Sequence, residues 1–493
     1  MQEKQPLLAR KWLVLISVGL GVFLATIDGS IVNIGLNTMV QDLDQPLVVV
    51  EWVVLAYMLT ISTLMISIGR LGDMIGKKPI YLTGVVIFTI GSGLCGMAPN
   101  VYWLIGFRVL QGVGASMTMA LGNAIVTEAF PAQERGKALG IMGTIVSLGI
   151  IAGPTIGGII LESLSWHWLF FVNLPVGVAG VLMVLKFVPK DAPGPKQRFD
   201  YAGAAALFVC LSSFLLALSL GQNGGFERLG VVSIFGVSII ALLAFIRIEM
   251  AVEQPMIDLH IFKNVLFSVN LITGFMVFIC TSGIVLIMPL YLQNVLGYGP
   301  RAAGLMLAVT PLVVAVVAPL SGNLSDRVGS RPISTVGLLI MVFGYLGVAS
   351  LNETTTTLGY MLRFIPIGLG IGMFQSPNNS AVMGSVPRER LGVASGLLSL
   401  TRTIGQTTGI AILSAVWENR VSFHAGGVLG GDVTDAPAVL QVAGLQDTVH
   451  LVVFILIAAF LISLWALGQF IKARRAGATP AQAQYAGTQM HDQ

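Results

Sequence analysis

One acidic side chain, Asp28, stands deep inside a long apolar run of the sequence, residues 12–36. Insertion scales put a charged group at the centre of a membrane-spanning helix at a cost of about 2.5–3.5 kcal/mol, and such residues usually face an ion or substrate pathway. A carboxyl group there can take up and release a proton. We therefore predict that Asp28 binds protons. The alternative is a static buried ion pair with Arg108.

Arg108 is the basic counterpart of this acid and lies in the apolar run 101–127. A guanidinium group in such a run needs a partner or water. One interpretation is a packed structural arginine. We favour the other, in which Arg108 is the partner of Asp28 in a proton relay.

The polar residues near Asp28 do not share its side of the helix. Four of them fall on another face: Thr26, Ser30, Asn33 and Asn37. At 100° per residue, Asp28 points about 200° away from Ser30. Either the helix distorts near Gly29, or the acid and the polar face serve different surfaces.

A charged, glycine-rich loop occurs twice. Residues 69–78 read GRLGDMIGKK and residues 322–331 read GNLSDRVGSR, 253 positions later. Glycines permit a tight turn and close helix approach, and the carboxylate can pair with a basic residue or a helix N-terminus. The basic residues alone would make a topology anchor. The repeated acid favours a conformational latch, because an anchor needs no acid.

The residues of this gating motif share small size or charge. They are Gly69, Gly72, Asp73, Gly76, Lys77 and Lys78, with Glu128 and Arg135 as expected partners and Asp326 and Arg327 in the second copy.

Glycines recur every four residues in the apolar run 138–160, at Gly149, Gly153 and Gly157, followed by Gly158. Such a stripe lets a neighbouring helix approach closely, and Pro154 predicts a kink. Simple close packing explains the stripe. A bent, tightly packed helix can also seal one side of a transport pathway, so we assign a gating role as well.

Several polar side chains in apolar runs are candidates for lining a substrate cavity, although hydrogen bonds between helices explain them equally well. They are Asn33, Gln111, Arg363, Gln375, Asn378, Arg402 and Gln406.

Composition indicates what kind of element must position these residues. The 493 residues are 55% hydrophobic and only 10% charged, against about 25% charged in soluble domains. A membrane span needs about 20 apolar residues, and fourteen runs qualify. They are residues 12–36, 49–69, 79–97, 101–127, 138–160, 168–188, 201–220, 229–247, 266–290, 302–320, 333–350, 357–380, 393–416 and 448–470. We predict an all-α integral membrane protein.

The distribution of Lys and Arg sets the expected orientation. If the N-terminus is cytoplasmic, 21 of the 27 basic residues fall on that side, three on the other and three inside spans. The positive-inside rule then predicts cytoplasmic N- and C-termini and an even number of spans.

The repeated loop also indicates a duplicated half. Residues 131–140 (PAQERGKALG) are echoed by residues 387–396 (PRERLGVASG) at nearly the same offset, as in transporters built from parallel repeats. We therefore divide the chain into two six-helix halves and an inserted helix pair. The predicted parts are an N-terminal segment 1–11, a bundle 12–188, a linker 189–265 with two additional spans, a bundle 266–470 and a tail 471–493.

These motifs resemble the major facilitator superfamily. GRLGDMIGKK is similar to its motif A, FRVLQGVGA (107–115) to its motif B and SLGIIAGPTIGG (147–158) to its motif C, typical of exporters. IDGSIVNIGL (27–36), WHWLFFVNLP (166–175) and PNNSAVMGSVPRERLGVASG (377–396) resemble the fourteen-span drug/proton antiporter branch. The resemblance covers residues 12–470 in order.

The resemblance implies a proton-coupled exporter of lipophilic or cationic drugs and toxic amphiphiles that works by alternating access. It implies a role for the span-1 acid in drug and proton exchange, and for motif A in holding the outward-facing state. We expect a monomer in the cell membrane, driven by the proton gradient without a cofactor. Export of a lipid, peptide or specialised metabolite is the alternative within transport.

Other functional classes find little support in the sequence. No P-loop, catalytic triad pattern or metal-ligand spacing occurs, which argues against an enzyme, a metal site and direct use of ATP. No basic cluster with interleaved aromatics points to nucleic acid, and no selectivity-filter repeat points to a channel. No further acid lies at mid-depth in the later spans, which argues against divalent cations as substrates.

Overall fold

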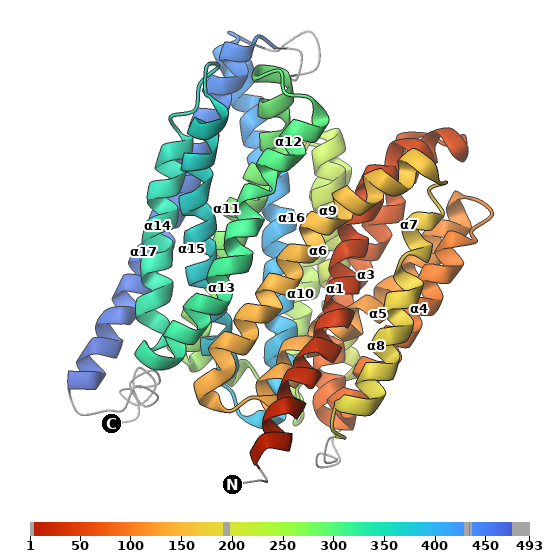
Figure 1. Cartoon of the computed structure of the whole chain (residues 1–493), viewed down its shortest axis with the longest axis vertical. Coiled ribbons are helices and arrows are strands. Elements are labelled where there is room, and N and C mark those ends of the chain that lie inside the picture. Colours follow the sequence, from red (N-terminus) through yellow and green to blue (C-terminus); the bar gives the residue numbers. More distant parts are fainter. Residues whose placement is uncertain (1–3, 191–197, 428–432, 434–435, 476–493) are drawn as a thin grey trace. The chain divides into compact units, whose positions relative to one another are not determined.

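The computed structural model describes residues 4–190, 198–427, 433 and 436–475, and within these ranges the chain forms helices and no β-strand (Figure 1). In the first part of the chain the elements are α1 (Lys4–Asp42), α2 (Leu47–Val50), α3 (Trp52–Ile75), α4 (Lys77–Gly96), α5 (Val101–Ala129), η1 (Ala132–Glu134), α6 (Arg135–Ser163), α7 (Trp168–Phe171), α8 (Asn173–Phe187), α9 (Tyr201–Gly224) and α10 (Leu229–Ala251). They continue with η2 (Leu259–Lys263), α11 (Val265–Leu290), η3 (Tyr291–Val295), α12 (Pro300–Leu307), α13 (Val309–Val328), α14 (Ser330–Val348), α15 (Thr357–Gly384), η4 (Arg388–Arg390), α16 (Leu391–His424) and α17 (Ala438–Arg475).

Thirteen helical segments of the described chain are long and apolar enough to cross a membrane. They coincide with thirteen of the fourteen predicted runs. The remaining run, 393–416, lies within α16, which is 34 residues long and therefore long enough to span. Its centre carries Arg402, Gln406 and several threonines, and these polar residues keep its hydropathy below that of the other spans. The fourteen-span architecture is consistent with these helices.

Several helices expose large apolar side chains on their outer faces. On α10, Ile239 is 59% exposed, Ile240 69% and Leu243 59%, and on α17 Phe454 is 70% exposed. Contiguous exposed apolar surface on this scale marks contact with another apolar phase. The outer faces of these helices are therefore built for lipid.

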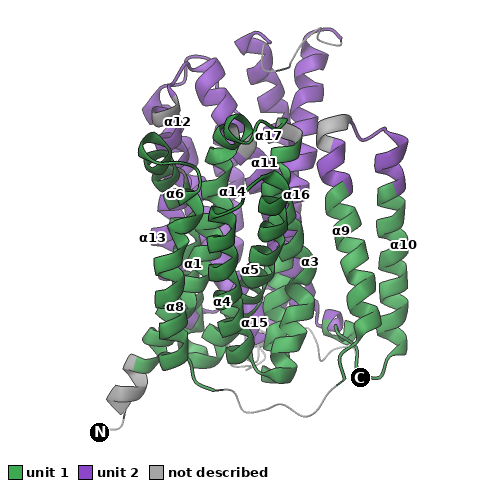
Figure 2. Ribbon diagram, turned by 90° about the vertical axis from the view of Figure 1, so that its right-hand side faces the viewer, with its two compact units in different colours: residues 1–216, 234–261, 386–400 green, residues 217–233, 262–385, 401–493 purple. Residues whose placement is uncertain are grey.

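The chain forms two compact units (Figure 2). Unit 1 comprises residues 1–216, 234–261 and 386–400, and unit 2 comprises residues 217–233, 262–385 and 401–493. In unit 1, α1 packs against α5, α6 and α8, and α5 also packs against α3 and α4. Unit 1 thus includes residues 386–400, which lie far along the chain from its other helices. The predicted halves 12–188 and 266–470 rest on the sequence repeat and stay a prediction.

In unit 2, α14 and α15 pack together, α13 covers α15, and α17 covers α11 and α14. The buried core of this unit includes Leu338, Met341, Leu413 and Leu456. The repeated loop has the same turn in both units. Gly76 has φ 109° and Gly329 has φ 104°, a region that favours glycine. The Gly76 N–H bonds to the Gly72 carbonyl and the Gly329 N–H to the Ser325 carbonyl.

Candidate functional site

Asp28 lies in a fully buried cluster in unit 1. Its side chain on α1 forms an ion pair with Arg108 on α5, and both side chains are 0% exposed. The amide of Gln111, one turn along α5, donates to the other Asp28 oxygen, Oδ1, at 2.8 Å. A buried ion pair survives only if its remaining hydrogen-bonding capacity is met, and Gln111 meets part of that need.

Asn173 is the second amide at this carboxylate. Its Nδ2 donates to Asp28 Oδ1 at 3.0 Å and to Ser92 Oγ at 3.1 Å. Ser92 in turn donates to the Phe170 carbonyl at 2.9 Å. Asp28 therefore receives hydrogen bonds from side chains of both α5 and α8.

Arg108 has partners besides the acid. Its Nε donates to the Val53 carbonyl at 2.8 Å and its Nη1 to Gln111 Oε1 at 2.7 Å. The guanidinium carbon lies 4.0 Å from the ring centroid of Tyr57, a favourable cation–π distance. Arg108 Nη2 has no hydrogen-bond partner among the described residues. The arginine is thus held by contacts besides the acid, and one of its donors makes no hydrogen bond within the described residues.

The opposite face of α1 contacts α6 instead. Ser30 Oγ donates to the Gly149 carbonyl at 3.1 Å, while Asp28 contacts α5 and α8. The helix is continuous through Gly29. Of the two explanations for the split polar pattern, the structure supports the second: the acid and the polar face serve different surfaces. Asn33 is exposed and its side chain bonds within its own helix, to the Gly29 carbonyl at 3.2 Å.

The glycine stripe of α6 makes the close contact with α1 that its spacing predicts. A methyl group added at Gly149 would lie 2.9 Å from Thr26 Cβ, and one at Gly157 would lie 2.9 Å from Ile31 Cγ1. At Gly153 it would overlap the Ser30 side chain and lie 2.9 Å from a backbone nitrogen. Gly158 differs, because nothing lies within 4 Å of that position. The Pro154 side chain lies outside the described residues, so its kink stays a prediction.

Asp73 of the gating motif binds the N-terminus of α16. The backbone N–H of Gly392 donates to Oδ1 at 2.8 Å and that of Val393 to Oδ2 at 3.0 Å. These amides are among the unsatisfied donors of a helix N-terminus, where the helix dipole also favours a carboxylate. A methyl group at Gly69 would overlap the Gly392 carbonyl. The motif thus joins α3 to a segment more than 300 positions away in the sequence.

Lys77 links this acid to a third helix. Its Nζ lies 3.1 Å from Asp73 Oδ1 and 2.8 Å from Glu128 Oε1 on α5. The predicted partner Glu128 therefore reaches the latch through Lys77. Lys78 has another role, because it donates to the Leu185 carbonyl at 3.0 Å, near the C-terminus of α8, where a cation is favoured.

The other gating residues are spread over both units. At Gly72 an added methyl group would overlap Leu121 on α5. Arg135 begins α6. Asp326 and Arg327 lie in the last turns of α13, in unit 2.

A second polar contact fixes the segment before α16. Arg390 forms an ion pair with Asp258, whose carboxylate also accepts the His260 backbone N–H at 2.9 Å. Partial burial disfavours the charged carboxylate, but the hydrogen bonds from His260 and Arg390 outweigh it and lower the pKa of Asp258. The Asp258 charge is therefore retained at neutral pH. It holds the loop after α10 against η4.

The predicted cavity residues are divided between the two units. Gln111 lies in the Asp28 cluster and is 0% exposed. In unit 2, Arg363 donates to the Gly347 carbonyl at 3.0 Å, near the end of α14. Asn378 is 4% exposed and its Oδ1 has no partner among the described residues. Gln375 on α15, like Arg402 and Gln406 on α16, is half-buried. Their role in a substrate cavity stays a prediction.

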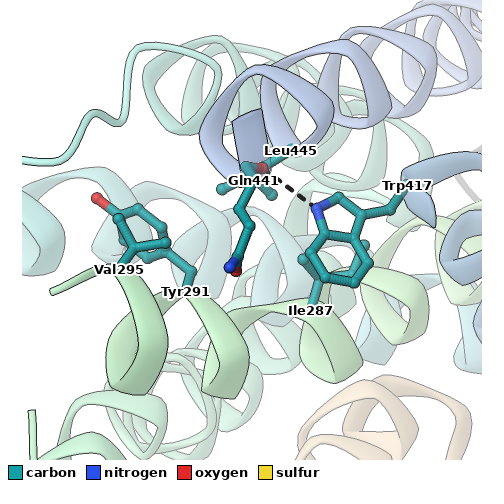
Figure 3. A pocket seen from close by; sticks show the side chains of 6 residues that line it. All are labelled: Ile287, Tyr291, Val295, Trp417, Gln441 and Leu445. Atoms are coloured by element: carbon teal, nitrogen blue, oxygen red, sulfur yellow. Dashed lines mark hydrogen bonds between the residues drawn. The ribbon is translucent and has the colours of Figure 1, made fainter. Parts of the chain in front are cut away.

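Unit 2 contains a small hollow (Figure 3). The Trp417 indole N–H donates to the Gln441 carbonyl at 3.3 Å beside it. Its lining residues are Ile287, Tyr291, Val295, Trp417, Gln441 and Leu445. The hollow has no room for a water-sized molecule, whereas small-molecule sites enclose roughly 300–1,000 Å³, and no predicted cavity residue lines it.

Three members of the buried cluster were not predicted from the sequence: Tyr57, Ser92 and Asn173. A weak signal exists for Asn173, which is a lone amide in the apolar stretch WHWLFFVNLP. Tyr57 and Ser92 carry no such signal, because isolated Tyr and Ser residues are common in membrane helices. Only the packing of α3, α4 and α8 around Asp28 identifies them.

The fold and the cluster define a polytopic helical membrane protein with a buried acid–base pair and a charged loop that binds a helix N-terminus. The family model of the Major Facilitator Superfamily matches residues 18–410, and the chain belongs to this family.

Similar proteins include the riboflavin transporter RibZ of Clostridioides difficile, 37% identical over 84% of this chain and 90% of that protein. The multidrug resistance protein Stp of Mycobacterium tuberculosis is 33% identical over 82% of this chain and 75% of that protein. Other similar proteins also have multidrug names, among them MdtP of Bacillus subtilis, 31% identical over 84% of this chain and 76% of that protein. Among solved structures, the human organic anion transporter MFSD10 (TETRAN) matches with a TM-score of 0.63 at 15% identity, over 92% of this chain and 99% of that one. At this identity the likeness shows the fold alone.

The glycine stripe yields a first prediction. Gly153→Ala should lower the stability of the folded protein by about 1–3 kcal/mol, since the added methyl group overpacks the contact with Ser30, and transport should fall with it. Gly158→Ala is the matched control and should leave both unchanged, because its position is open. Thermal unfolding of the purified variants and an efflux assay measure the two effects. Equal behaviour of the two variants would contradict this role for the stripe.

The latch yields a second prediction. Asp73→Ala leaves the N–H groups of Gly392 and Val393 without their acceptor, at a cost of about 1–3 kcal/mol for each buried unmade hydrogen bond. Hydrogen–deuterium exchange of residues 391–400 should therefore become faster. Asp42→Ala removes an exposed acid of α1 and should leave that exchange unchanged. Unaltered exchange in Asp73→Ala would mean that the carboxylate does not hold α16.

Proposed function

We propose that the chain is a proton-coupled exporter of lipophilic or cationic drugs and toxic amphiphiles that works by alternating access in the cell membrane. The observation that carries this proposal is the fully buried pair of Asp28 and Arg108. An isolated pair of charges in such surroundings is costly, and packed apolar residues would be no less stable. An intramembrane acid is therefore best explained by a function that uses its charge.

The cluster supports a two-state cycle. With Asp28 ionised, Arg108, Gln111 and Asn173 all direct donors at it. When a proton binds, the acid loses its need for these donors. Arg108 then stays with the Val53 carbonyl, the Tyr57 ring and Gln111. Proton binding and release thus switch the bonds between α1, α5 and α8.

Two contacts of unit 1 are suited to transmit that switch. The polar face of α1 packs on the glycine stripe of α6. A movement of α1 would therefore also displace α6. The latch of Asp73 and Lys77 joins α3 and α5 to the start of α16. A change in α5 at Arg108 therefore extends along the same helix to Glu128. In this proposal the latch stabilises the outward-facing state, with the proton gradient as the driving force.

Asp28→Asn is the direct test of this mechanism. The amide keeps polar contacts with Gln111 and Asn173 but cannot ionise, so we expect uphill dye efflux to be abolished while the protein inserts normally. Asp42→Asn, an exposed acid of the same helix, should pump like the unmodified protein. Everted vesicles with a fluorescent dye, with and without a protonophore, provide the measurement. Uphill pumping by Asp28→Asn would refute proton coupling at this residue.

A second candidate substrate class follows from the relative that transports riboflavin. Its identity of 37% over 84% of this chain exceeds the 33% of the multidrug relative Stp. A neutral, planar amphiphile is also compatible with a chain for which no acid beyond Asp28 is predicted at mid-depth. We therefore include flavins among the candidate substrates.

Competition distinguishes the two substrate classes. If the chain handles amphiphiles broadly, riboflavin and a lipophilic cationic dye should inhibit each other's transport in vesicles. If it is specific for flavins, labelled riboflavin should be transported and a large excess of dye should not inhibit it. Dye efflux that is insensitive to riboflavin would exclude the flavin candidate.

A further inference from the structure

Two further buried acids lie at the ends of helices α9 and α10, outside the Asp28 cluster. Asp200 immediately precedes α9 and is 8% exposed. Glu249 lies in the last turn of α10 and is 4% exposed. Both belong to unit 1.

Each of these carboxyl groups has one oxygen in a hydrogen bond and one without a partner. Asp200 Oδ1 accepts the Gly203 N–H at 2.8 Å, and Glu249 Oε2 accepts the Ile257 N–H at 3.0 Å. The other oxygens, Asp200 Oδ2 and Glu249 Oε1, have no partner among the described residues. Each buried oxygen without a hydrogen-bond partner lowers the free energy of unfolding by about 1–3 kcal/mol.

Both unpartnered oxygens lie beside Gly203. A methyl group added at Gly203 would overlap Asp200 Oδ2 and would lie 2.8 Å from Glu249 Oε1. The missing side chain at Gly203 therefore leaves room for both oxygens. Two ionised carboxylates in this arrangement repel, whereas one proton turns the same pair into an O–H donor and its acceptor.

The helix ends decide which acid carries the proton. Asp200 caps the N-terminus of α9, where the helix dipole stabilises a negative charge. Glu249 lies at the C-terminal end of α10, where the dipole disfavours one. The proton therefore belongs on Glu249 Oε1 and is donated to Asp200 Oδ2, while Glu249 Oε2 keeps the Ile257 N–H as a carbonyl oxygen would.

Neighbouring charges do not replace that proton. Arg70 on α3 faces Glu249, but no ion pair within the described chain joins it to either acid. Arg390, which interacts electrostatically with Arg70, is bound to Asp258. A metal ion is a poor occupant, because hard cations take about six or more oxygen ligands and this site offers two free ones.

We propose that Asp200 and Glu249 form a proton-binding site separate from Asp28, in which one shared proton ties the start of α9 to the end of α10. The site is occupied at acidic pH. It empties as the pH rises, and the two carboxylates then repel and loosen the helix pair. The proposal holds whether or not Asp28 couples protons to transport.

Amide variants of the purified full chain test this site. In Glu249→Gln or Asp200→Asn the amide N–H₂ stands in for the bridging proton, so either variant should fold normally. Each should unfold about 2–4 °C above the unmodified protein at alkaline pH and match it at acidic pH. Glu253→Gln is the matched control, since Glu253 is exposed and four residues beyond Glu249, and it should leave the pH profile unchanged.

Infrared spectroscopy supplies an independent measurement. The unmodified protein at mildly acidic pH should show the C=O stretching band of a buried protonated carboxyl group, and Glu249→Gln should lack it, while Asp28→Asn and Glu253→Gln retain it. The proposal is overturned if the band survives in Glu249→Gln, or if the pH profiles of both amide variants superimpose on that of the unmodified protein. Failure of both amide variants to fold would overturn it as well, because the amides are predicted to preserve the bridge.

Discussion

A buried charge must find a partner, and the contact between Asp28 and Arg108 is where this constraint is strongest. Both side chains are fully buried, so breaking the pair without compensation would cost about 3–5 kcal/mol. The neighbouring groups reduce that cost for both charges. Gln111 and Asn173 donate hydrogen bonds to the acid, and the Val53 carbonyl and the Tyr57 ring bind the arginine. Helices α1, α3, α5 and α8 are thereby fixed around one buried carboxyl group.

The same constraint explains the other polar contacts of unit 1. Asp73 accepts hydrogen bonds from the otherwise unsatisfied amides at the start of α16, and Lys77 pairs with Asp73 and Glu128. Glycines at the helix contacts let backbones approach closely enough for these bonds to form, as Gly69 shows against Gly392. Where two acids meet without a base, at Asp200 and Glu249, a proton is the simplest partner. Charge pairing and close helix packing thus act together in this protein.

Residues that look alike in the sequence differ in what they contact in the folded protein. Gly158 follows the glycine stripe, but its position faces open space, unlike that of Gly153. Lys77 and Lys78 are adjacent, yet the first completes the latch and the second binds carbonyl groups at the end of α8. Asn173 looks like a minor polar residue in the sequence and turns out to donate directly to Asp28. A sequence motif therefore identifies functional candidates, but it does not specify what each of these residues contacts.

The sequence by itself determined the membrane class, the helical spans and the family, because hydropathy over about 20 residues and local motifs depend on nearby residues alone. It also identified Asp28, Arg108 and Asp73, since a charge in an apolar run or a repeated acid is visible locally. The tertiary structure decided the partners: which face of α1 meets α6, that Asp73 binds the α16 N-terminus, and that Asp200 and Glu249 both lie beside Gly203. Those facts depend on the rotation and packing of helices brought together from distant parts of the chain, and helical periodicity alone does not specify them.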